Sequence, residues 1–207
     1  MITPNKRNRR ILNMVEMAML VALVVVLQMV SAIIPPIGGT VSITLTLVPV
    51  VVGAILFGVK GGAVLGFSFG AIVLINCISG IDIGGNILWN TNPFCTALIC
   101  FVKGTAAGVI PAVAYKLVKG KKENSSNGRK YVSALSAALC APIANTGLFV
   151  CGMLLFFMET LKAWAGGSPL ASYVLLGLAG LNFIVEFIIN IVLTPAIVRV
   201  VEAVKNK

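Results

Sequence analysis

Three polar side chains recur every four residues along the last apolar stretch of the chain. Asn182, Glu186 and Asn190 stand among neighbours that are almost all aliphatic or aromatic. A spacing of four returns to the same face of an α-helix, so the three side chains point in one direction. An ionisable group at membrane depth costs at least a few kcal/mol and normally faces a cavity or a partner. We therefore expect this stripe to line a ligand site, where the amides and the acid exchange hydrogen bonds with a polar molecule.

A cationic side chain, Lys103, lies inside another apolar stretch. Counted from the outer ends of their helices, Lys103 is about 14 Å deep and Glu186 about 20 Å deep, so the two can share one chamber. Two interpretations stay open. In the first, the residues form a buried ion pair with no role in binding. In the second, Lys103 meets an anionic group of a ligand, and buried amides such as Asn76 and Asn145 contribute further hydrogen bonds.

A polar loop at residues 80–93 precedes the stretch that contains Lys103. It combines Asp82 and paired glycines with Trp89, Asn90 and Asn92. A hydrated loop would have this polarity, and a tryptophan also suits the interface of a membrane. We favour the interpretation that the loop is a lid over the ligand site, because binding residues concentrate on loops held by a rigid scaffold. Trp164, near the other outer loop, is expected at the interface.

Several kinds of chemistry are disfavoured by the residue types. The chain contains no histidine, which removes the most frequent general base and metal ligand at neutral pH. The GxSxG pattern at residues 66–70 lacks a base and falls in an apolar helix rather than a strand-to-helix turn. No P-loop is present, because Gly120-Lys121 is followed by lysine and no glycine stands five residues before it. We expect no catalytic activity, no cofactor and no metal site.

The elements that must position these residues are membrane helices. The chain has 207 residues, of which 58% are hydrophobic and 11% charged, so it is too apolar for an ordinary soluble domain. Apolar windows of helical length predict an all-α membrane protein, a bundle of six transmembrane helices in one domain at residues 14–204. The predicted spans are residues 14–34, 44–58, 62–79, 94–118, 131–157 and 172–201. The second is short and contains Pro49, which predicts a tilted, kinked or re-entrant segment. Glycines at four-residue spacing in the third and fourth spans predict close helix packing.

The basic residues set the expected orientation. The net charge is +10, and 14 of the 16 lysines and arginines fall on one side of the predicted bundle. They occupy the tail 1–13, the turn at Lys60, the linker 119–130 and the C-terminal end, whereas Lys162 lies on the other side. Positive charge stays in the cytoplasm, so both termini are expected inside. Because this charge lies in short segments between apolar runs, we expect a lipid bilayer as the partner and no nucleic acid.

The chain as a whole resembles the substrate-binding S components of energy-coupling factor (ECF) vitamin transporters. The resemblance rests on the length, the six predicted spans, the basic N-terminal tail and an AxxxA element, AMLVA at residues 18–22. It rests also on LVPVVVGAILFGVKGGAVLG at residues 47–66 and on Thr91-Asn92-Pro93 before the span with Lys103. The resemblance implies a subunit of a multi-pass, prokaryotic plasma-membrane importer that works with a T component and two ATP-hydrolysing subunits. Ala18 and Ala22 would then face the T component.

The ligand is less well defined by the sequence. Residues 42–66 and the Thr-Asn-Pro element look most like pantothenate-type members, and a cationic Lys103 suits a vitamin that carries a carboxylate. Riboflavin, folate and other vitamins or precursors stay open as substrates. A different class also stays open, a self-sufficient secondary transporter in which Glu186 relays an ion.

Overall fold

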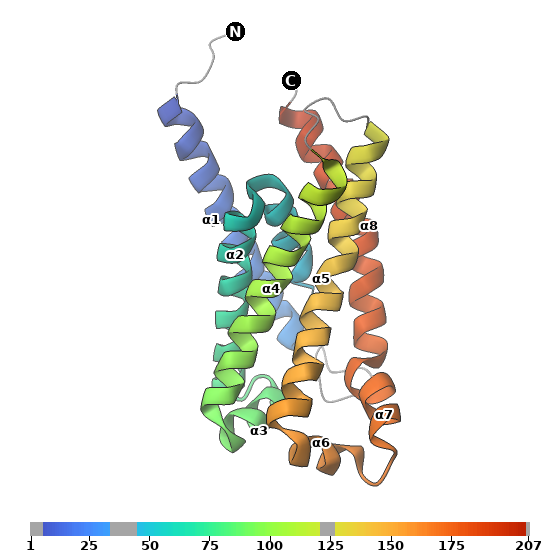
Figure 1. The fold of residues 1–207 in the computed structure, drawn as a ribbon. Helices are drawn as coiled ribbons and strands as arrows, with labels where there is room; N and C mark the ends of the chain where they lie inside the picture. The colour runs from blue at the N-terminus through green and yellow to red at the C-terminus, as the bar shows by residue number, and fades with distance from the viewer. Residues whose placement is uncertain (1–5, 34–44, 121–126, 206–207) are drawn as a thin grey trace.

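The computed structural model describes residues 6–33, 45–120 and 127–205, and these ranges are almost entirely helical, with no β-strand among them. Figure 1 shows the long helices standing side by side, with the short ones gathered at one end of the bundle. In chain order the elements are α1 (Lys6–Ile33), α2 (Leu47–Ser79), α3 (Ile83–Thr91), α4 (Pro93–Lys119), α5 (Asn127–Phe156), α6 (Met158–Ala165), α7 (Leu170–Ser172), the π-helical segment η1 (Tyr173–Gly180) and α8 (Leu181–Lys205).

Four of these helices are long and apolar enough to cross a bilayer, namely residues 10–31, 47–79, 93–119 and 128–156. A fifth candidate is the bent pair 170–178 and 183–198, whose two halves meet at 41°. The described residues therefore provide four or five candidate spans instead of the six predicted. Most of the difference lies in α2, where the predicted spans 44–58 and 62–79 join into one continuous helical element.

The chain reverses its direction inside α2. Gly58 has a φ of 69° and a ψ of −160°, a conformation that only glycine adopts easily. A Cβ on Gly53 would meet the side chain of Leu65, and one on Gly62 would lie 3.1 Å from the Cβ of Ala54. Residues twelve apart in a straight helix are about 18 Å apart, so residues 47–57 must fold back against the segment that follows Gly58. The break expected between the two spans is thus present as a turn.

The second arm of α2 packs closely on α4. A Cβ on Gly66 would strike the carbonyl oxygen of Gly104, and one on Gly62 would strike that of Gly108. In lipid no hydrophobic drive joins helices, so close backbone approach through small residues supplies the van der Waals contact. The predicted role of these glycines in helix packing is confirmed.

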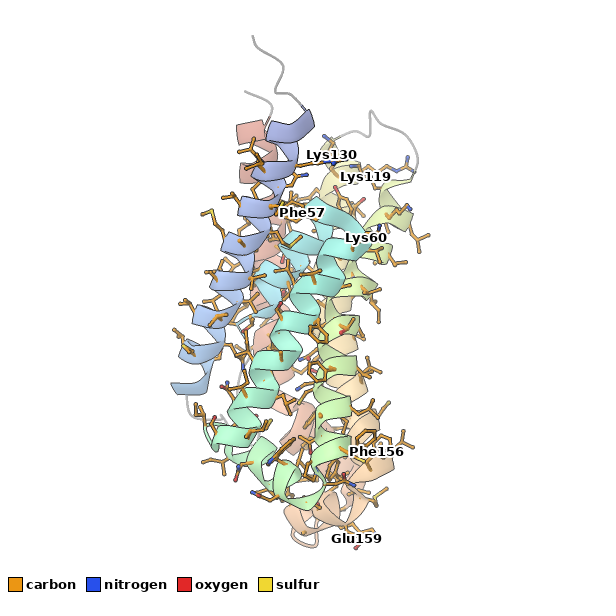
Figure 2. The ribbon with its side chains drawn as sticks, turned by 90° about the vertical axis from the view of Figure 1, so that its left-hand side faces the viewer. Phe57, Lys60, Lys119, Lys130, Phe156 and Glu159 are labelled. Atoms are coloured by element: carbon orange, nitrogen blue, oxygen red, sulfur yellow. The ribbon has the colours of Figure 1, made fainter. Side chains whose placement is uncertain are left out.

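The two ends of the bundle differ in charge. The helix α1 begins and α8 ends at the same end (Figure 1), and Lys60, Lys119 and Lys130 gather there (Figure 2). Phe156 and Glu159 lie at the opposite end, with α3 and α6. The predicted tail 1–13 is already helical from Lys6, because arginine and leucine are good helix formers. Residues 121–126 of the predicted linker 119–130 lie outside the described part of the chain.

Candidate functional site

A small cavity lies at the α3–α6 end of the bundle, around Lys103 of α4. Its walls come from five helices. They include Cys77 of α2, Leu88 of α3, Thr96 of α4 and Phe149 of α5, and α6 contributes Trp164. The cavity encloses about 30 Å³, which is the room that one water molecule needs. It is therefore a largely closed site whose wall holds one cationic group, Lys103, one carboxylate, that of the α3 cap Asp82, and two aromatic rings.

Lys103 is half-buried, and its Nζ lies 4.8 Å from the centroid of the Phe149 ring. A cation over an aromatic face gains about 1 kcal/mol, and more where water is excluded. Among the described residues, the Phe149 ring is the partner of the ammonium, and no carboxylate lies within ion-pair distance of it. An ammonium that contacts only a ring is available to an anionic group that enters the cavity.

The helix α3 is attached over the cavity by polar contacts of the loop. Asp82 caps α3, because its carboxylate accepts a hydrogen bond from the backbone N–H of Gly85 at 3.1 Å. The Nδ2 of Asn86 donates to the carbonyl of Cys77 at 2.8 Å, which ties α3 to the end of α2. These contacts hold Gly84 and Gly85 against the cavity. Loss of these hydrogen bonds would move α3 and, with it, the part of the cavity wall that α3 forms.

Two asparagines predicted to contact a ligand have local partners in this structure. Asn90 is exposed, and its Nδ2 donates to the carbonyl of Asn86 at 3.0 Å. Asn92 is also exposed and caps α4, where its Oδ1 accepts from the N–H of Cys95 at 3.1 Å. Neither residue is part of the cavity wall. The capping role explains why an asparagine directly precedes Pro93, which suits the first turn of a helix.

The two tryptophans differ in their relation to the cavity. Trp164 of α6 lines the cavity, whereas Trp89 of α3 packs beside the apolar core formed by α1, α2 and α4. The sequence favoured Trp89 as the lid and placed Trp164 at the interface. The difference arises because α6 turns back under the bundle, next to α5, which brings a residue far along the chain beside Lys103 (Figure 1).

A layer of buried polar side chains lies deeper, between α5 and α8. Asn145 is 6% exposed, Asn190 and Thr194 are fully buried, and Glu186 is 4% exposed. The Nδ2 of Asn190 donates to the backbone carbonyl of Glu186 at 2.9 Å. Among the described residues, Asn145 Oδ1, Asn190 Oδ1 and Thr194 Oγ1 have no hydrogen-bond partner. An unsatisfied buried polar atom costs about 1–3 kcal/mol, so these three atoms leave hydrogen-bonding capacity that the described residues do not use.

Packing neighbours place this layer close to the cavity. Val198 of α8 shares a core cluster with Ala141 of α5, and the two helices run in opposite directions (Figure 1). Asn145, four residues after Ala141, and Thr194, four residues before Val198, therefore both lie about one turn from this cluster toward the α3–α6 end of the bundle. Phe149 is one turn from Asn145 on the same face of α5 and forms part of the cavity wall. Phe149 thus belongs both to the cavity wall and to the face of α5 that carries Asn145.

The structure gathers some of the predicted site residues and separates others. Lys103 belongs to the cavity, and Asn145, Glu186 and Asn190 belong to the deeper layer. Asn182 is in α8, but its side chain lies outside the described residues. Asn76 is buried in α2, and its backbone carbonyl accepts from the N–H of Asp82 at 3.1 Å.

Sequence reasoning missed several residues of the site. Thr194 continues the four-residue series of the α8 stripe, so the spacing itself could have found it. Thr96 stands two turns before Lys103 and shares its face of α4, which is a weaker signal. Nothing in the sequence around Phe149 distinguishes it from the other apolar residues of its helix. Its role depends on the helix that α5 packs against.

A separate surface concerns Ala18 and Ala22. Both are exposed on α1, whose apolar window is only 17% buried. Ala18 also lines a surface hollow of about 450 Å³ together with Met14, Met17 and Phe57. Ala18 and Ala22 therefore do not pack against the described part of the bundle, but leave a shallow apolar face exposed.

Comparisons with known proteins agree with this picture. Residues 12–198 match the model of the family described as "ECF transporter, substrate-specific component". The chain is 28% identical over 174 residues to the pantothenic acid transporter PanT of Lactococcus lactis subsp. cremoris (strain MG1363), a match that covers 79% of each chain. No solved structure matches the chain significantly.

Proposed function

This chain belongs to the family of ECF transporter substrate-specific components, and from that premise we propose that it captures pantothenate from outside the cell. It delivers the vitamin together with a T component and two ATP-hydrolysing subunits. The observation that carries the choice of ligand is the half-buried ammonium of Lys103, which faces a ring instead of a carboxylate at the wall of a closed cavity. The similarity to a pantothenic acid transporter supports the same choice.

The chemistry of pantothenate fits the two parts of the site. Its carboxylate pairs with Lys103, a charge-assisted contact that is about twice as strong as a neutral hydrogen bond. Its amide N–H and two hydroxyls can donate to Asn145 Oδ1, Asn190 Oδ1 and Thr194 Oγ1, which lack partners among the described residues. In this way the ligand supplies the donors that the protein does not supply itself.

The cavity must enlarge to admit such a ligand. A volume of about 30 Å³ is far below the 300–1,000 Å³ typical of small-molecule sites. Phe149 lines the cavity one helical turn from Asn145, and its ring lies 4.8 Å from Lys103 Nζ. We propose that the carboxylate takes the place of the ring at Lys103, after which Phe149 turns aside and the two spaces join. Lys103 thus contacts the Phe149 ring before the ligand binds and the carboxylate of the ligand afterwards.

The proposed topology places the cavity outside. The lysine-rich end of the bundle faces the cytoplasm with both termini, because positive charge is retained there (Figure 2). The end with α3 and α6 then faces the exterior of a prokaryotic cell. The two arms of α2 serve as the second and third of six membrane segments, and the bent pair that includes α8 serves as the sixth.

Coupling to the energising subunits is assigned to α1. The exposed face around Ala18 and Ala22 offers the close approach that helix association in lipid requires. A larger side chain there leaves the cavity untouched, because none of the described side chains of α1 lines it. Binding and transport can therefore be separated by mutation.

The test is to identify the small molecules that copurify with the detergent-solubilised chain by mass spectrometry. The expected result is pantothenate, released when the protein is denatured and competed away by added pantothenate. Retention of riboflavin or folate would assign another vitamin, and would contradict the role given to Lys103 if the retained vitamin lacks a carboxylate. Uptake by the purified chain alone in vesicles, abolished by an uncoupler, would show a secondary transporter instead.

A further inference from the structure

A groove of about 570 Å³ opens at the end of the bundle opposite the cavity. It lies between the turn of α2, which contributes Phe57 and Lys60, and the last turns of α4, which contribute Tyr115, Lys116 and Lys119. Figure 2 shows Phe57, Lys60 and Lys119 close to this end of the bundle. The groove is therefore built from two elements that are distant in the sequence.

The charge of the groove is positive over the residues that the structure describes. Three of its described lining residues are lysines, and none of them is an aspartate or glutamate. Lys60 and Lys116 are exposed, and Lys119 Nζ lies 5.4 Å from the centroid of the Tyr115 ring. Lysines in the last turn of a helix offset its dipole, which accounts for Lys116 and Lys119 but not for Lys60, which comes from a different element.

The floor of the groove is apolar. Ala54 and Ile55 of the first arm of α2 and Ala112 of α4 lie beneath the lysines. A site for a free anion would need only the charges, whereas this groove adds an apolar surface directly below them. That combination matches an amphiphile whose charged group stands above a hydrocarbon part.

We propose that this groove binds an anionic phospholipid of the cytoplasmic leaflet, with the phosphate among Lys60, Lys116 and Lys119 and an acyl chain against the apolar floor. With the topology proposed above, on which this inference rests, the groove lies at the level of lipid headgroups on the cytoplasmic side. Basic pockets between helices on the cytoplasmic side are suited to such headgroups. Bound lipid would hold the turn of α2 against the end of α4.

The experiment measures binding of short-chain phosphatidylglycerol to the purified full-length chain in a neutral detergent by native mass spectrometry. The triple variant Lys60→Gln, Lys116→Gln, Lys119→Gln removes the charge, and the triple arginine variant at the same positions retains it. Lys162→Gln removes one exposed lysine at the opposite end and serves as the control. Two further compounds are measured in parallel. Phosphatidylcholine tests whether binding needs a net charge on the headgroup, and inorganic phosphate tests whether the anion binds without an acyl chain.

The proposal predicts that each lysine contributes about fivefold to affinity, so the glutamine variant binds phosphatidylglycerol on the order of a hundredfold more weakly. The arginine variant and Lys162→Gln bind it as the native chain does, and phosphatidylcholine binds weakly to all. The proposal is overturned if the native chain does not prefer phosphatidylglycerol, or if the glutamine variant binds it unchanged. Inorganic phosphate that binds as tightly as the lipid would show an anion site instead. Loss of assembly with the energising subunits, without lipid binding by the native chain, would assign the groove to a protein partner.

Discussion

Replacing Lys103 by methionine tests the central feature of the site. Methionine has a similar length and no charge, so it removes the ammonium from the cavity wall with little change in volume. The expected result is a large loss of affinity for pantothenate, because the carboxylate then enters a partly dry site with no opposite charge. The measurement is the Kd of the purified chain by isothermal titration calorimetry.

The magnitude follows from the burial of Lys103. Two unit charges about 4 Å apart attract by about 4 kcal/mol at the effective dielectric constant of a partly buried site. The native chain gives up the contact between Lys103 and the Phe149 ring, worth about 1 kcal/mol, when the ligand binds. The net loss in the variant is about 3 kcal/mol, which raises Kd on the order of a hundredfold.

Two controls separate this explanation from a damaged fold. The neutral amide of pantothenate should bind the native chain and Lys103→Met with Kd values within about fivefold of each other, because neither complex contains an ion pair. Lys162→Met, an exposed residue of α6 paired with Glu159, should leave the Kd for the acid unchanged. Equal losses for the acid and the amide, or an unchanged Kd for the acid, would refute the role of Lys103.

Three further predictions follow from the helices around the site. Ala18→Leu or Ala22→Leu should abolish uptake by cells that contain the energising subunits while leaving Kd unchanged; loss of binding as well would mean that this face packs the bundle. Gly66→Ala should lower the free energy of unfolding by about 1–3 kcal/mol in thermal melts, because its Cβ would strike α4, whereas Gly147→Ala, with open space, should not. Thr194→Val should keep or raise the melting temperature, since it removes a buried hydroxyl without a partner, yet weaken binding about tenfold. A fall in both the melting temperature and the affinity would indicate that the Thr194 hydroxyl stabilises the fold.

The sequence predicted the residues whose polarity conflicts with their surroundings. Glu186 and Asn190 stood out because a buried acid and amide are costly in lipid, and the structure buries both. The glycine spacing predicted the contact between α2 and α4, because helices in lipid associate through small residues that let their backbones approach closely. The burial and the glycine contact could be predicted because each depends on local spacing and on the solvent, whereas binding of a ligand by Glu186 and Asn190 stays a prediction.

Features that depend on how distant segments meet were not predictable in the same way. Trp89 and Trp164 have similar local contexts, and only the course of α6 under the bundle decides which one reaches the cavity. Asn92 was predicted as a ligand residue, and the structure adds a capping role that the adjacent Pro93 already indicated. The number of candidate spans differs from the six predicted, because hydropathy does not show whether an apolar run of 33 residues is straight or folded back.

The reversal at Gly58 has a consequence for how the chain enters the bilayer during synthesis. Residues 47–57 span only about 16 Å, roughly half the thickness of the hydrocarbon, and nearly all of their first eight side chains are enclosed by protein. So short a segment is a poor stop signal for the insertion machinery by itself. We expect it to be retained until residues 59–79 have emerged and to enter as a paired hairpin, so that a ribosome stalled between the two halves would leave the nascent chain with a single integrated helix.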